Sequence, residues 1–212
     1  IAAEPDLILA AANMKNDTKF LNAFEELGYA VLYLQADTFD DYLRVLELCT
    51  QLTGQPENYE RYGASVQEQV DAALARTDGS DPSVLYVRAS GSSCKARGSE
   101  GTVLGEMLAA LGCRNIADNE GNGLLDELSI EAIIAEDPEY IFVVYYGSKQ
   151  ADAEALLEET LLSNPAWTGL TAVREGRCFV LDKSLYHLKP NARWGEAYEN
   201  LANILYGGET TE

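Results

Sequence analysis

Two stretches of the chain, 133 residues apart, share one plan. Residues 1–10 (IAAEPDLILA) and residues 134–143 (IAEDPEYIFV) each place acidic residues and a proline directly before a run of apolar residues. Proline cannot continue a helix, and four or more consecutive apolar residues are typical of a strand that is covered on both faces. A helix–proline–strand unit that occurs twice predicts two similar α/β lobes. Two lobes imply a cleft, and a cleft is where a ligand binds.

Apolar runs that suit strands alternate with amphipathic segments along the rest of the chain, which is typical of an α/β fold with mainly parallel sheets. We expect two Rossmann-like lobes joined by one long helix. The first lobe is expected over residues 1–55, the connecting helix over residues 56–77 and the second lobe over residues 78–212. The helix opens at Pro56 and reaches the turn-rich residues 78–82 (DGSDP) without an interruption.

The first lobe is shorter than the second. Only two strands, residues 6–12 and 30–34, precede the connecting helix, whereas about four are expected after it. Because a two-stranded parallel sheet makes a poor domain, we expect the first lobe to be truncated at its N-terminus. The chain also begins at Ile1 without a charged and apolar leader, which predicts a processed or trimmed product.

The chain is strongly acidic, with 15 Lys and Arg against 35 Asp and Glu and a net charge of −20. It is expected to repel nucleic acid and anionic lipid, since both are bound chiefly through Lys and Arg. No apolar run approaches the roughly 20 residues that span a bilayer. The single histidine excludes a metal site built on several histidines. The chain also lacks G-x-G-x-x-G, P-loop and G-x-S-x-G motifs, which weighs against an enzyme.

Ligands of open α/β sheets bind at the carboxyl ends of the strands. In the second lobe these ends carry a group of cations and aromatic residues, namely Arg88, Lys95, Arg97, Tyr145, Tyr146, Tyr186, His187, Lys189, Arg193 and Trp194. Such a group in an acidic chain favours a planar or polyanionic ligand, held by charged donors and aromatic faces.

The candidate ligand-binding residues are Asn13, Lys95, Arg97, Tyr145, Tyr146, Tyr186, His187 and Arg193. Lys95, Arg97 and Arg193 are expected to line one basic wall of the cleft. Either Tyr145 or Tyr146 must point into packing, because adjacent strand residues face opposite ways.

Four segments carry motifs of one known family. Residues 4–9 (EPDLIL) resemble a strand of its first lobe, and residues 101–112 (GTVLGEMLAALG) resemble its small-residue opening followed by G-E-L-L. Residues 129–138 (SIEAIIAEDP) match its S-x-E and D-P-D pattern. Most specific are residues 164–180 (NPAWTGLTAVREGRCFV), which resemble D-P-A-W-x-x-L-x-A-V-x-x-G-R-V-Y-V. Together they are similar to the class III solute-binding proteins of ABC importers, the receptors for ferric siderophores, haem and cobalamin.

The resemblance implies two α/β lobes joined by one rigid helix. It also implies an extracytoplasmic protein, which is a lipid-anchored surface protein in Gram-positive bacteria or is free in a periplasm. Members dock on an ABC permease and ATPase complex through one acidic residue per lobe, and Glu158 or Glu159 suits that role in the second lobe. Residues 186–195 (YHLKPNARWG) are not a general family motif and look like a feature of a clostridial-type branch.

The favoured hypothesis is a non-enzymatic receptor without an intrinsic cofactor or a protein-held metal, which captures an iron–siderophore complex for import. Haem is an alternative ligand, because phenol and imidazole groups can ligate haem iron and cations suit its propionates. Cobalamin or another chelate also stays open. From other functional classes, the alternatives are a two-lobed α/β enzyme and a sensor domain that uses the same fold.

Overall fold

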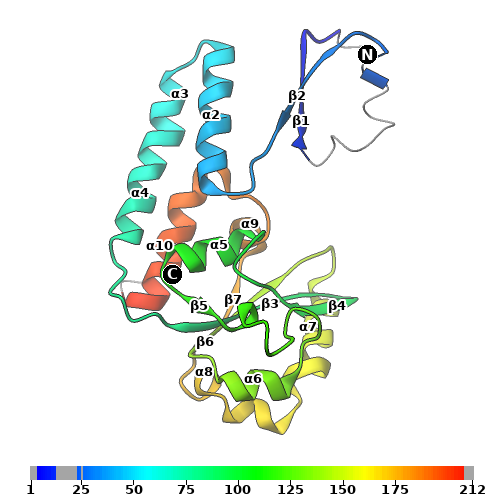
Figure 1. The fold of residues 1–212 in the computed structure, drawn as a ribbon, viewed down its shortest axis with the longest axis vertical. Helices are drawn as coiled ribbons and strands as arrows, with labels where there is room; N and C mark the ends of the chain where they lie inside the picture. The colour runs from blue at the N-terminus through cyan, green and yellow to red at the C-terminus, as the bar shows by residue number, and fades with distance from the viewer. Residues whose placement is uncertain (1–3, 13–22, 25, 208–212) are drawn as a thin grey trace. The chain divides into compact units, whose positions relative to one another are not determined.

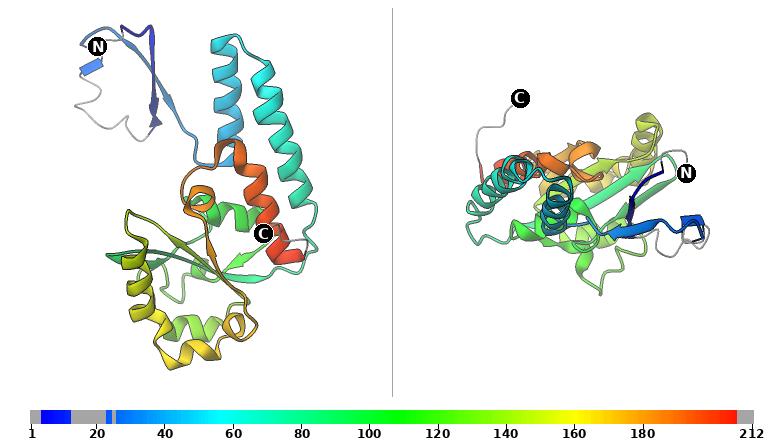
Figure 2. Two further views of the ribbon diagram at one scale, coloured as in Figure 1. Left: turned by 180° about the vertical axis from the view of Figure 1, so that it is seen from behind. Right: turned by 90° about the horizontal axis from the view of Figure 1, so that it is seen from above.

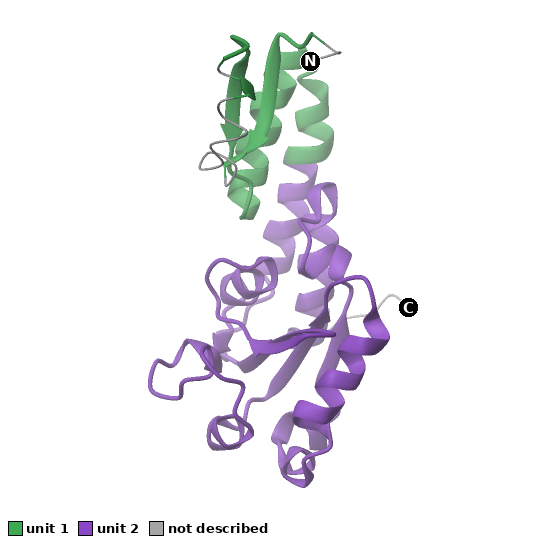
Figure 3. Cartoon of the chain, turned by 90° about the vertical axis from the view of Figure 1, so that its right-hand side faces the viewer, with its two compact units in different colours: residues 1–63 green, residues 64–212 purple. Residues whose placement is uncertain are grey.

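A computed structural model describes residues 4–12, 23–24 and 26–207. The chain divides into two compact units, residues 1–63 and residues 64–212 (Figure 3). The predicted three-part division differs from this one, because it placed residues 56–77 in neither lobe. Among the described residues, no helix has both the length and the apolar character needed to cross a membrane.

Unit 1 holds a two-stranded parallel sheet and a capped helix. Strand β1 (Leu7–Ala11) pairs with β2 (Ala30–Leu34), with Leu7 opposite Ala30. Helix α2 (Phe39–Thr53) begins after Thr38, whose side chain accepts a hydrogen bond from the backbone N–H of Asp41 at 3.1 Å. The Asp41 carboxylate accepts in return from the backbone N–H of Thr38 at 3.3 Å, so the two residues form a capping box.

The predicted connecting helix is a continuous helical run, but its middle is not α-helical. It consists of α3 (Glu57–Tyr59), the π-helical turn η2 (Glu60–Ala64) and α4 (Ser65–Leu74). The boundary between the units falls after Gly63, inside η2. The run therefore has no break, although its hydrogen-bond register changes at the boundary, which the sequence did not predict.

The sheet of unit 2 is mainly parallel, as expected. Its order is β4-β3-β6-β7, with β5 also paired to β3. The strands are β3 (Ser83–Ser90), β4 (Ser93–Ala96), β5 (Arg114–Asn115), β6 (Tyr140–Tyr145) and β7 (Cys178–Leu181). The pairs of β3 with β5, β3 with β6 and β6 with β7 are parallel, so the carboxyl ends of β3, β6 and β7 lie along one edge. Among the described strands of this sheet, β4 alone is antiparallel, and it forms a hairpin with β3 that the sequence analysis did not predict.

Ten helical segments surround this sheet in the described part of unit 2, besides α4. They are α5 (Val103–Ala110), η3 (Ile116–Asp118), α6 (Ile130–Glu136), α7 (Gln150–Leu157), η4 (Glu158–Leu162), η5 (Pro165–Gly169), α8 (Thr171–Arg174), α9 (Lys183–Tyr186), η6 (Asn191–Arg193) and α10 (Trp194–Tyr206). Figure 1 shows α6, α7 and α8 on one side of the sheet and α5, α9 and α10 on the other.

Strand alternation divides the central side chains between these two faces. Leu85, Val87, Ile141 and Val143 belong to a hydrophobic core that also contains residues of α6, α7 and α8. The residues between them, such as Phe142 of β6, point to the face of α9 and α10. We call these the α7 face and the α9 face. This alternation determines on which of the two faces a residue just beyond a strand end lies.

On the far side of α10 lies α4, and the two helices pack side by side (Figures 1 and 2). Gly195 is required at their contact, because a Cβ there would lie 2.1 Å from the Gln69 amide oxygen. At the end of α4, the Arg76 guanidinium donates to the Asn203 side chain at 2.6 Å and to the Ala202 carbonyl at 3.1 Å. These contacts fix α4 to the body of unit 2.

Candidate ligand-binding site

Three side chains meet on the α9 face at the carboxyl edge of the sheet. Tyr146 directly follows β6, and its backbone N–H donates to the Ala89 carbonyl at 2.9 Å. The Arg88 guanidinium carbon, from β3, lies 4.9 Å from the centroid of the Tyr146 ring. The His187 ring, from the segment after α9, lies 5.2 Å from the same ring, centroid to centroid. We call Arg88, Tyr146 and His187 the aromatic–cation cluster.

The charges around the cluster are positive. Burial lowers the pKa of His187 below its ordinary value, and the charges of Arg88, Lys183 and Arg97 lower it further. The Lys183 ammonium lies close by, where it donates to the Gly147 carbonyl at 3.2 Å. His187 is therefore neutral at neutral pH. A site that disfavours a positive charge on its histidine favours a negatively charged ligand.

The Tyr146 phenol shows the same preference. Hydrogen bonding with the Ser90 side chain is the largest effect and lowers the phenol pKa. Hydrogen bonding with Ser93 and the charges of Arg88 and Arg97 act in the same direction, whereas burial opposes them. The surroundings of Tyr146 thus stabilise negative charge at the position of its hydroxyl.

Several cations in the described part of the chain form ion pairs, and the cations of the cluster differ from them. Arg44 pairs with Asp41, Lys149 with Asp152, Arg177 with Glu175 and Arg193 with Glu196. Within the described residues, Arg88, Lys95 and Arg97 form no ion pair. Arg88 and Lys95 also lie opposite one another in the β3–β4 pair, an arrangement of like charges that is unfavourable. Unpaired cations that adjoin in a chain of net charge −20 indicate an anionic ligand.

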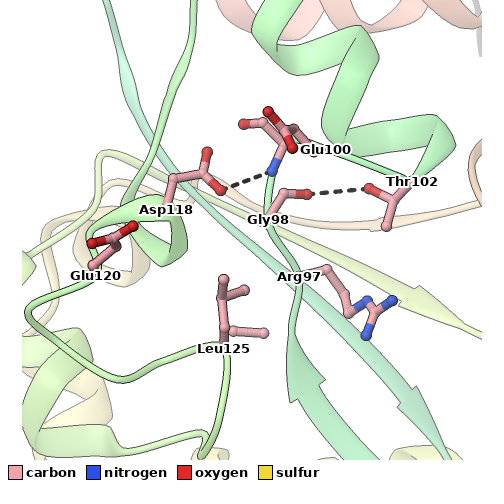
Figure 4. A pocket seen from close by; sticks show the side chains of 9 residues that line it. Arg97, Gly98, Glu100, Thr102, Asp118, Glu120 and Leu125 are labelled. Atoms are coloured by element: carbon pink, nitrogen blue, oxygen red, sulfur yellow. Dashed lines mark hydrogen bonds between the residues drawn. The ribbon is translucent and has the colours of Figure 1, made fainter.

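Two cavities adjoin this surface. The smaller has a volume of about 250 Å³ and is lined by Ser90, Gly91, Ser92, Tyr146, Gly147, Ser148, Lys149 and Asp152. The larger, of about 610 Å³, is lined by Ala96, Arg97, Gly98, Ser99, Glu100, Thr102, Asp118, Glu120 and Leu125 (Figure 4). Tyr146 thus borders one cavity and Arg97 the other. In the larger cavity, Asp118 accepts from the Ser99 N–H at 3.0 Å and fills the space that a side chain at position 98 would need.

The structure separates the predicted site residues. Lys95, Arg97, Tyr146 and His187 lie on or beside the aromatic–cation cluster. Tyr145 packs against the hydrophobic core on the α7 face, so it is the tyrosine of the pair that points into packing. Asn13 lies outside the described residues. No metal site emerges either, since no group of three or more His, Cys, Asp or Glu in the described segments is placed to hold an ion.

Two predicted contacts do not fit their surroundings. Tyr186 is only 3% exposed, and its hydroxyl donates to the Ala197 carbonyl at 3.1 Å. Burial raises its pKa, so this side chain stabilises the packing of α9 on α10 and does not face a ligand. Arg193 donates twice to the Glu196 carboxylate, with both contacts at 2.6 Å. This carboxylate already neutralises Arg193, so we do not count Arg193 with the unpaired cations, and its place in the basic wall stays a prediction.

Arg88 and Lys183 are the site residues that sequence reasoning did not select as candidates. Arg88 was noted among the cations near the strand ends but was not selected. Its position two residues before Ser90 could have identified it, because that spacing places both side chains on one face of β3. Lys183 had no signal beyond its place after β7. The docking candidates Glu158 and Glu159 begin the π-helical turn η4 and are exposed, and their role stays a prediction.

Comparisons with known proteins agree with this architecture. A profile of the periplasmic binding protein family matches residues 1–185. Among solved structures, an ABC transporter substrate-binding protein from Listeria monocytogenes superposes with a TM-score of 0.74 at 18% identity, over 98% of this chain and 79% of the other. The periplasmic haem-binding protein RhuT from Roseiflexus sp. RS-1 gives 0.72 at 25% identity, over 97% and 77%.

A third solved structure, the iron-uptake system-binding protein FeuA from Bacillus subtilis, superposes with a TM-score of 0.68 at 19% identity, over 96% of this chain and 72% of the other. A search of curated protein sequences found no match.

Proposed function

Since the chain belongs to the periplasmic binding protein family, and within it to the class III solute-binding proteins, we propose that it captures an anionic iron chelate for an ABC importer. One observation carries the choice of ligand. The cations Arg88, Lys95 and Arg97 form no ion pair among the described residues. Arg88 and Arg97 act on the partly exposed Tyr146 and His187, and Lys95 lies opposite Arg88. An iron–siderophore complex with several negative charges is the ligand that this surface suits best.

The chemistry of recognition follows from these side chains. Arg88, Arg97 and Lys183 donate charge-assisted hydrogen bonds, each of which contributes about 1.5–3 kcal/mol. Tyr146 and His187 offer ring faces to an aromatic chelating group. A siderophore fills the coordination shell of its iron by itself, so the receptor needs only charge and shape to hold it. The names of two similar structures, an iron-uptake protein and a haem-binding protein, support an iron-containing ligand.

The proposal includes the partners and the place of work. The protein delivers its ligand to a permease and ATPase complex on the extracytoplasmic side, either from a periplasm or as a lipid-anchored surface protein. Exposed Glu158 and Glu159 provide the acidic contact of unit 2 with the permease. We also propose that the chain belongs to a clostridial-type branch, which residues 186–195, including His187, support. None of these roles requires catalysis.

Ligand titration tests the proposal. A ferric tris-catecholate is added to the protein while the fluorescence of Trp167 and Trp194 is followed, and a saturable change is expected. Replacement of both Arg88 and Arg97 by Gln is expected to weaken binding by about a hundredfold or more, because two charge-assisted contacts are lost. A protein that binds no iron chelate at all, at concentrations up to the solubility of the chelate, contradicts the proposal.

Haem is the second candidate, favoured by the likeness to RhuT at 25% identity and by cations that suit two propionates. Haemin titration separates it from the siderophore. Saturable one-to-one binding with a sharp shift of the Soret band, together with no response to the ferric catecholate, would assign haem in place of the siderophore.

A further inference from the structure

We propose that capture of the anionic ligand is coupled to protonation of His187. The ligand neutralises the cations that surround the imidazole, so His187 takes up a proton as the ligand binds, and binding strengthens as the pH falls. The identity of the ligand rests on the proposed function. The coupling itself is a property of the aromatic–cation cluster and can be tested without an iron chelate.

The geometry places His187 where a bound anion would act on it. Its ring lies 5.2 Å from the Tyr146 ring, and the Arg88 guanidinium lies 4.9 Å from that same ring. His187 remains partly exposed, so a ligand held by Arg88 can approach the imidazole. An anion at this point is within the short range over which opposite charges shift a titration strongly.

The charged groups that act on His187 come from three segments, and they have one sign. Arg88 comes from β3, Arg97 from the segment after β4 and Lys183 from α9, and all three oppose a positive imidazole. From the segment after β6, the ring in contact is the neutral phenol of Tyr146.

Two carboxylates of the segments on either side of His187, those of Asp182 and Glu196, have other partners. Asp182 accepts from the Ser184 backbone N–H and hydroxyl, both at 2.8 Å. Glu196 is held by Arg193 at 2.6 Å. Neither carboxylate contributes to the pKa of His187. The described part of the chain therefore supplies no anion that stabilises the imidazolium, and a bound anionic ligand would do so.

The direction of the coupling follows from linkage. In the free protein, burial and the three cations hold the pKa of His187 below its ordinary value of 6.5. An anionic ligand favours the protonated ring and raises this pKa. Between the two pKa values binding takes up a proton, and by reciprocity lower pH tightens binding, by about tenfold for each unit of ligand-induced shift. Below the lower pKa or above the higher one, the affinity no longer changes through His187.

Nuclear magnetic resonance can follow this residue without assignment, because His187 is the only histidine of the chain. The imidazole resonances are recorded from pH 5 to 8, in chloride and in sulfate at equal ionic strength. We expect a pKa below the ordinary histidine value in chloride and a higher one in sulfate, whose charge is constant over this range. Equal pKa values in the two salts, or an unshifted pKa in chloride, would overturn the coupling.

Two variants with the same change of charge locate the effect. Arg88→Gln is expected to raise the pKa of His187 in chloride and to reduce the response to sulfate. Arg174→Gln is the control, because Arg174 ends α8 just before β7 begins and so lies at the opposite edge of the sheet. If both variants shift the pKa equally, general electrostatics explains the shift and the cluster does not.

Calorimetry with the ferric tris-catecholate completes the test. Measured in two buffers of different ionisation enthalpy at pH 6 to 7, the wild type is expected to take up a fraction of a proton per ligand, and His187→Gln none. Binding without any difference in proton uptake between the two proteins would disprove the coupling and leave the proposed function intact. A His187 pKa that rises in sulfate, in a protein that binds no ferric tris-catecholate, would support the coupling and contradict the proposed function.

Discussion

Arg88 and Arg193 carry the same charge in different surroundings. Arg88 stands over the Tyr146 ring and forms no ion pair in the described part of the chain, whereas Arg193 donates twice to Glu196. An arginine that is already neutralised gains little from a second anion, while an unpaired one gains the full charge-assisted hydrogen bond. What distinguishes a binding residue here is its partner and not its residue type.

Affinity measurements on single variants test this distinction. Arg88→Gln is expected to weaken ferric tris-catecholate binding by about tenfold or more, since one charge-assisted contact contributes about 1.5–3 kcal/mol. Arg193→Gln is expected to change the dissociation constant less than about threefold. The dissociation constants are compared by fluorescence titration. Equal losses in the two variants would contradict the assignment of the anion site to Arg88.

For Tyr186 we predict the opposite result, a change in stability without a change in ligand affinity. Tyr186→Phe removes a buried hydroxyl that donates to the Ala197 carbonyl, so we expect the free energy of unfolding to fall by about 0.5–1.5 kcal/mol. Ligand affinity should not change, because the side chain is buried. Chemical denaturation and ligand titration measure the two effects separately. Weaker ligand binding at unchanged stability would restore Tyr186 to the site.

Among the elements, the helical run from α3 to α4 departs most from its prediction. Its π-helical turn η2 is held by tight side-chain packing. The Tyr42 hydroxyl donates to the Tyr62 carbonyl at 2.6 Å, which supplies a partner where the helix register changes. Gly63 lies in the same turn, and a Cβ at this position would meet the Tyr59 ring at 3.0 Å and Leu46 at 3.2 Å. The turn therefore depends on a glycine that a regular helix would not need.

This packing predicts an unusual outcome for a glycine in a helix. Gly→Ala normally stabilises a helix by about 0.5–1 kcal/mol, but Gly63→Ala is expected to destabilise unit 1 by about 1–3 kcal/mol through overpacking. Gly169→Ala serves as the control, because nothing lies within 4 Å of a Cβ there. Thermal unfolding measures both variants. A Gly63→Ala protein as stable as the wild type would show that Tyr59 and Leu46 can move aside.

Local sequence signals predicted the regular elements of unit 2 well. The apolar run of β6 and the proline before it each depend on neighbours in the chain, and both are present. Strand β4 was missed because its residues, Ser93 to Ala96, have little strand propensity and are held by pairing with β3. The π-helical turn was missed for a similar reason, since it depends on Tyr42 from another helix.

For the molecule as a whole, the sequence gives the net charge directly but does not show where the charges lie on the surface. A net charge of −20 describes the average surface, whereas the aromatic–cation cluster is a local exception to it. The exception arises from parallel pairing, which brings residues 88, 146 and 187 to one edge from positions far apart in the chain. Composition and spacing indicated that cations lie near strand ends, but only the sheet register selects which of them meet.

The central claim is that this protein recognises its iron chelate by negative charge. The most direct test compares two dissociation constants of the wild-type protein, one for a trianionic ferric tris-catecholate and one for a neutral ferric tris-hydroxamate. With at least two charge-assisted contacts at about 1.5–3 kcal/mol each, we expect the anionic chelate to bind about a hundredfold more tightly or better. A neutral chelate that binds equally well or more tightly would contradict the claim.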